Sequence, residues 1–139
     1  MLPSFEEKSV WVQLISLLVV LGGYFLVSGF MLARGIVVLA PYIPLFIVSV
    51  VLLVIVLVVG HILAAVTGTP EKRDERDRLI GWRAESNSSW ILAVGVFGAL
   101  NAIAFSVAPV WIAHILLASL FASEAMKLSL QIVYYRRGV

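Results

Sequence analysis

Long uninterrupted runs of apolar residues dominate the pattern along the chain. Four of these runs have the length, about 20 residues, that an α-helix needs to cross the hydrocarbon core of a bilayer. They cover residues 10–32, 42–66, 88–106 and 110–134. The segments around them are short, so the pattern predicts one transmembrane domain over residues 1–139, an all-α, integral membrane four-helix bundle.

The polar residues between the second and third runs form a different pattern. Thr69 suits a helix N-cap, Pro70 suits the first helical position, and oppositely charged residues four apart follow, such as Asp74 and Arg78. We therefore predict a charged helix over residues 70–86 that continues directly into the third span. Residues 71–85 hold five acids and five bases. Such a segment is either a solvated, self-paired helix or a docking surface for a partner.

Lysine and arginine residues are distributed unevenly among the polar segments. The leader, the middle segment and the tail together hold eight, whereas the two remaining loops hold only Arg34. Cytoplasmic loops carry an excess of these residues, so both termini and the charged helix are predicted to be cytoplasmic. Aromatic residues near the predicted span ends fit an interfacial belt: Trp11, Tyr42, Trp82, Trp90, Trp111, Tyr134 and Tyr135.

Composition supports the bilayer as the solvent and narrows the chemistry. Hydrophobic residues make up 62% of the chain and charged residues 13%, against about half and a quarter in soluble domains. The chain has no cysteine, which excludes disulfides, thiolate metal sites and cysteine nucleophiles. Its net charge of +2 is not gathered on one basic face, so nucleic acid is not an expected partner.

Ionisable side chains inside predicted spans are the first candidates for function, because they are costly in a bilayer. Glu124 and Lys127 are three residues apart on the fourth span and share a helix face. The pair has two interpretations. It is a proton- or ion-coupled site in the bundle interior, or it is a neutralised pair whose lysine extends toward the interface.

His61 and His114 raise the possibility of a haem, because paired imidazoles can ligate iron. The two residues lie toward opposite faces of the predicted membrane, so we expect cross-helix hydrogen bonds and no metal or cofactor. Asn101 is predicted to lie deep in the third span, where its amide needs a partner.

Small residues recur four apart on the third and fourth spans, and such rows let helices approach closely. They predict tight packing between these spans within one chain or, alternatively, a homodimer seam. The rows are Gly95–Ala99, Gly98–Ala102–Ser106, Ala118–Ala122 and Ser119–Ser123.

Motifs typical of enzymes are absent from the sequence. It contains no HExxH, GxSxG, Walker or CxxC pattern. Glu124 is also the only carboxylate within the predicted spans, so no acid–base pair is available there. We predict that the chain is not an enzyme and has no catalytic residues.

Two segments, DERDRLIGWRAESNSSWILAVGVFG (residues 74–98) and SEAMKLSLQIVYYRRG (residues 123–138), resemble a bacterial family of small four-span membrane proteins. In that family a DERD-type motif precedes the third span. The family has no established activity, and its genes often lie beside small helix-turn-helix regulators, which implies a regulatory or stress context. The matching positions are Asp74, Glu75, Arg76, Asp77, Arg78, Glu124 and Lys127.

These patterns together predict a non-enzymatic protein of the bacterial inner membrane that acts by association with itself or with another membrane protein. The charged helix would supply the contact surface. One alternative is a small dimeric proton-coupled transporter that uses Glu124, although this carboxylate lies in the last span beside a lysine. Another is an immunity protein against a membrane-active toxin.

Overall fold

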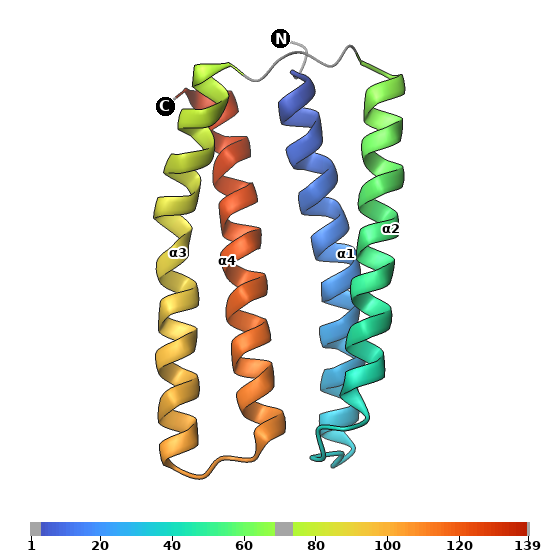
Figure 1. Cartoon of the computed structure of the whole chain (residues 1–139), viewed down its shortest axis with the longest axis vertical. Coiled ribbons are helices and arrows are strands. Elements are labelled where there is room, and N and C mark those ends of the chain that lie inside the picture. The colour runs from blue at the N-terminus through green and yellow to red at the C-terminus, as the bar shows by residue number, and fades with distance from the viewer. Residues whose placement is uncertain (1–3, 69–73, 139) are drawn as a thin grey trace.

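The computed structural model describes residues 4–68 and 74–138, which form four helices (Figure 1). The helices are α1 (Phe5–Ala33), α2 (Tyr42–Val66), α3 (Glu75–Ala104) and α4 (Pro109–Arg137). Each is long and apolar enough to cross a membrane. The predicted all-α fold with four membrane-length helices is thereby confirmed.

The helices are antiparallel and pack in the order α3, α4, α1, α2 (Figure 1). Consequently α2 and α3, which follow one another in the sequence, lie on opposite sides of the assembly. Both termini lie at the same end as the last turn of α2 and the first turn of α3. The structure thus gathers at one end the segments that carry most of the lysine and arginine residues.

The contact between α1 and α4 supplies the apolar core of the charged half. Val10, Leu14 and Leu17 of α1 pack against Leu128 and Ile132 of α4, and all five are buried. Helix α1 begins just before this core, where the Ser4 hydroxyl accepts a bond from the backbone N–H of Glu7 at 3.2 Å. Such a cap satisfies one of the free donors of the first turn.

Small residues allow α3 and α4 to approach closely, as the rows in the sequence predict. A methyl group added at Gly95 would collide with the side chain of Ser119. Ala99 is buried in the same interface, and the Ser123 hydroxyl donates to the carbonyl of Ser88 at 3.1 Å. Ala118 and Ala122 are exposed instead. The serine row of α4 therefore forms the intramolecular contact.

Helix α3 is continuous from the charged segment into the membrane span, as expected. Its beginning differs from the prediction, because Asp74 is the N-cap and Glu75 the first helical residue; Thr69 and Pro70 lie outside the described residues. Thirty residues make α3 about 45 Å long, whereas the hydrocarbon core is about 30 Å thick. Helix α3 is therefore longer than an untilted crossing of that core requires.

The far end of α3 is also shorter than predicted. The helix ends at Ala104, and Ser106, which was expected in a small-residue row, instead adopts a left-handed backbone with φ of 56°. A residue in that conformation cannot continue a right-handed helix. The turn before α4 therefore begins two residues earlier than the predicted end of the span.

Helix α2 is the most apolar helix and the least buried. Its buried residues are Tyr42, Ser49 and Ala64, and its contact with α1 includes Gly60, which lies against Val12. Most of its large side chains are exposed, as expected for a helix that faces lipid rather than protein.

Candidate functional site

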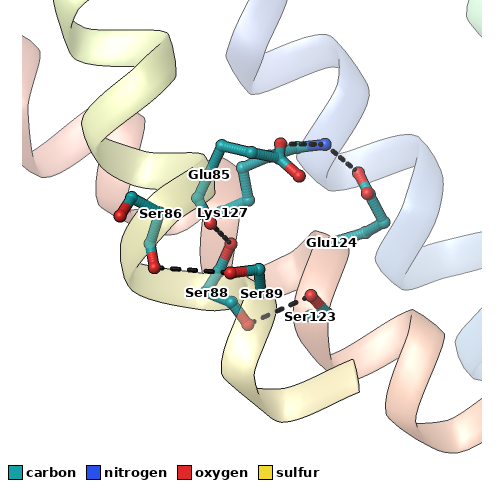
Figure 2. Close-up of polar contacts among 7 residues, drawn as sticks. All are labelled: Glu85, Ser86, Ser88, Ser89, Ser123, Glu124 and Lys127. Atoms are coloured by element: carbon teal, nitrogen blue, oxygen red, sulfur yellow. Dashed lines mark hydrogen bonds and ion pairs between the residues drawn. The ribbon is translucent and has the colours of Figure 1, made fainter. Parts of the chain in front are cut away.

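Three charged residues from α3 and α4 meet at one point (Figure 2). Lys127 Nζ lies 2.6 Å from Glu124 Oε2 and 3.3 Å from Glu85 Oε2. The ion pair between Glu124 and Lys127 fits their shared helix face. Glu85 was not among the candidate residues, because the sequence alone placed it among the solvent-facing charges of residues 70–86.

The position of Glu85 follows from the register of the two small-residue rows. Ser88 pairs with Ser123 in the antiparallel α3–α4 contact. Moving three residues back along α3 and four residues forward along α4 therefore brings Glu85 to Lys127. The sequence contains this signal, but reading it requires the decision that these rows face each other within one chain.

The cluster of Glu85, Lys127 and Glu124 contains two carboxylates and one ammonium. Its members differ in exposure: the side chains of Glu85, Glu124 and Lys127 are 61%, 39% and 21% exposed. Glu85 thus lies toward the solvent-facing end and Lys127 between the helices. When all three groups are ionised, the cluster carries a net charge of −1.

Hydroxyl groups surround this cluster but bind the backbone. Ser88 Oγ donates to the carbonyl of Glu85 at 3.2 Å, and Ser89 Oγ donates to the carbonyl of Ser86 at 3.4 Å (Figure 2). These bonds satisfy the hydroxyls within their own helix. Within residues 4–68 and 74–138, no group of three or more His, Cys, Asp or Glu side chains is arranged to hold a metal ion.

An apolar groove runs beside the cluster, between α1, α2 and α4. It has a volume of about 330 Å³, and Glu124 is part of its lining. Aromatic rings from all three helices form much of the rest, including Tyr24, Phe46 and Phe121. An adjoining hollow of about 320 Å³ shares Tyr24 and Phe46 and continues toward His114.

The two histidines bond to neighbouring helices at different levels of the molecule. His61 Nε2 lies 2.9 Å from Ser9 Oγ, near the charged end. His114 Nε2 lies 3.2 Å from the Tyr24 hydroxyl, and its ring stacks on that of Tyr24 with centroids 5.9 Å apart. Each ring also reaches a carbonyl of its own helix through Nδ1. The structure does not bring the two imidazoles together.

Asn101 lies closer to a helix end than the predicted span implies. It lies three residues from the end of α3, is exposed, and donates to the carbonyl of Phe97 at 2.8 Å. The amide thus finds a partner within its own helix, and its depth in a bilayer stays a prediction.

The DERDR segment divides into residues that hold the fold and residues that face outward. The side chain of Asp74 accepts from the backbone N–H of Glu75 at 2.7 Å, and Asp77 closes the capping box. Asp77 also accepts from the Tyr135 hydroxyl at 2.9 Å, while Arg76 donates to the Tyr135 carbonyl at 3.3 Å. Asp74 thus caps α3, whereas Asp77 and Arg76 attach the start of α3 to the end of α4.

Glu75, Arg78, Leu79 and Trp82, which we call the outer patch, are neighbours on the surface of α3. Arg78 and Trp82 also border a hollow of about 360 Å³ that Asp77 and Tyr135 line. The four residues of the outer patch line a shallow depression of about 370 Å³, and the Trp82 side chain, at 74% exposure, projects from it. Of the five predicted contact residues, Glu75 and Arg78 are thus the two that line this depression.

Comparison with known proteins returned no match, either among protein families, curated proteins or solved structures. The resemblance to the bacterial four-span family therefore remains a prediction.

Proposed function

We propose that the chain is a non-enzymatic protein of the bacterial inner membrane that acts by association with itself or with another membrane protein, in a regulatory or stress context. The outer patch is its contact surface. The observation that carries this proposal is the exposure of Trp82 in the charged N-terminal part of α3. Exposed aromatic residues beside opposite charges are typical of protein contact surfaces.

The charges of the outer patch support this role. Glu75 and Arg78 flank Leu79 and Trp82, so a partner would meet an apolar centre with one acid and one base at its edge. An interfacial anchor for the bilayer would use Trp82 and Arg78 but would gain nothing from the acidic Glu75. The specificity that opposite charges provide favours a protein partner over lipid.

The distribution of basic residues supports a cytoplasmic position for this surface. Among the described residues, those at the end with both termini include Lys8, Arg78, Arg83 and Arg136, whereas the opposite loops contain Arg34. The positive-inside rule then places both termini and the outer patch in the cytoplasm.

Charge reversal at the outer patch tests the association. Arg78→Glu should abolish recovery of the partner, or of a second copy carrying a different tag, when the protein is purified from its host. Arg83→Glu is the matched control, because Arg83 is exposed on the same helix but outside the patch. Equal recovery with the two variants would refute the outer patch as the contact surface.

A small proton-coupled transporter is a second candidate, favoured by one observation. Glu124 lines a groove that opens between α1, α2 and α4, and Lys127 is shared with Glu85 instead of neutralising Glu124 alone. In proteoliposomes, Glu124→Gln should then abolish substrate-dependent proton flux, whereas Glu7→Gln should not. Flux that survives Glu124→Gln would exclude this mechanism.

A further inference from the structure

The groove beside the Glu85–Lys127–Glu124 cluster has a chemistry that association through the outer patch does not use. Its wall is almost entirely apolar, and Glu124 is the only acidic or basic residue among those that line it, as far as the described part of the chain shows. A lipid acyl chain would need no such group. A carboxylate at the edge of an apolar groove instead defines one end of the groove as a site for positive charge.

Aromatic rings add to this preference for positive charge. Tyr24 and Phe46 lie edge to face with their centroids 5.9 Å apart, and Phe25 and Phe121 lie 5.5 Å apart. All four rings line the groove. The faces of aromatic rings attract cations, most strongly where water is excluded, and they also pack well against flat apolar groups.

The cluster allows Glu124 to accept a new partner. Lys127 contacts Glu85 as well as Glu124, so a cation that binds Glu124 does not leave the ammonium without a carboxylate. The bound state would then hold two carboxylates and two positive charges. Binding of the cation cancels the net charge of −1, and this attraction favours the bound state.

We propose that this groove binds an amphiphilic organic cation, with its positive group at Glu124 and its apolar or aromatic body between Tyr24, Phe46 and Phe121. The body can extend into the adjoining hollow, which shares Tyr24, Phe46 and Leu117 with the groove and reaches Tyr42 and His114. Binding of the cation in this groove does not require the association through the outer patch or transport of the cation.

Tetraphenylphosphonium is a suitable probe, because its charge is permanent and its surface is aromatic. We would measure its binding by equilibrium dialysis against the full chain in lipid nanodiscs, with protein-free nanodiscs as the blank. We expect saturable binding of one cation per chain. Glu124→Gln should weaken this binding at least about tenfold, because the site then lacks its carboxylate. Glu7→Gln, which alters a carboxylate paired with Arg136 outside the groove, should leave it unchanged.

A second variant keeps every charged side chain and fills the volume of the groove. Leu120 is a lining residue at 47% exposure, so Leu120→Trp should fill the groove, leave the helices intact by circular dichroism, and weaken binding to a similar extent. Three results would each overturn the proposal. The first is uptake of the cation no greater than that of empty nanodiscs, and the second is undiminished binding in both variants. The third is equal saturable binding of the isosteric anion tetraphenylborate. That result would identify a groove for any apolar molecule, including an acyl chain.

Discussion

The α3–α4 contact and the α1–α2 contact show how differently two helix pairs in one membrane protein can be built. In the first, Gly95 lies directly against Ser119 and a hydroxyl crosses to the carbonyl of Ser88. In the second, Gly60 lies against a terminal methyl group of Val12 rather than the backbone-proximal atoms of a neighbour, and most of α2 is exposed. Lipid is as apolar as leucine, so hydrophobicity does not hold helices together there. Close approach of the backbones and polar bonds between helices hold them together instead. Both features are most frequent in the α3–α4 contact.

The largest effect is expected from filling the closest approach. Gly95→Leu should destabilise the protein by about 3 kcal/mol or more, because the new side chain meets the body of Ser119 and the helices must separate. Gly60→Leu should cost clearly less, since Val12 can change its rotamer. Gly22→Leu, with nothing within 4 Å of the added Cβ, is the control. Unfolding in mixed detergent micelles measures the free energy of unfolding of all three variants. Equal losses for the substitutions at positions 95 and 60 would contradict the difference between the α3–α4 and α1–α2 contacts.

The next effect concerns the charge cluster that joins α3 to α4. Lys127→Met leaves Glu85 and Glu124 without their shared ammonium and should cost about 2 kcal/mol, less than in a dry interior because Glu85 is largely exposed. Adding Glu85→Gln should recover part of this loss by removing one of the two like charges. Thermal unfolding followed by circular dichroism gives both values. A double variant less stable than Lys127→Met alone would show that the carboxylates do not repel.

A smaller difference is expected between the two histidines. His114 is buried, stacks on Tyr24 and bonds to its hydroxyl, so His114→Ala should cost about 2 kcal/mol through the lost packing and bond. Ser9→Ala, which removes the bonds of the Ser9 hydroxyl to His61 and to Gln13, should cost about 1 kcal/mol. The same unfolding assay applies. A larger loss at Ser9 would mean that α1–α2 depends on polar bonds more than α1–α4 does.

The smallest effect is expected at Asn101. Its exposed amide bonds to a carbonyl of its own helix near the helix end, so Asn101→Leu should change stability by less than about 0.5 kcal/mol. The same substitution tests the homodimer seam that the small residues of the third span allow. Loss of a dimer on size-exclusion chromatography with light scattering would show that the amide bonds across two copies.

The sequence predicts most strongly those features that depend on composition or on spacing within one helix. Apolar length predicts the four spans, and the three-residue spacing predicts that Glu124 and Lys127 share a helix face. The recurrence of Gly95–Ala99 and Ser119–Ser123 also indicates which spans pack most closely. Each of these signals lies within a single segment of the chain.

The features that sequence reasoning missed depend on contacts between segments or on the ends of helices. Glu85 joins the cluster only through the α3–α4 register, and the groove requires the relative placement of α1, α2 and α4. Asp74 and Asp77 were interpreted as surface charges because the helix was expected to begin earlier. The third span was expected to end at residue 106 because the left-handed turn at Ser106 has no clear signature in the sequence.

Native mass spectrometry of the wild-type chain, purified from its host in mild detergent, tests the association most directly. We expect a complex of fixed stoichiometry with a second copy or with another membrane protein. Arg78→Glu should dissociate this complex, and Arg83→Glu should not. A wild-type chain that is monomeric under conditions that preserve its fold would contradict the account.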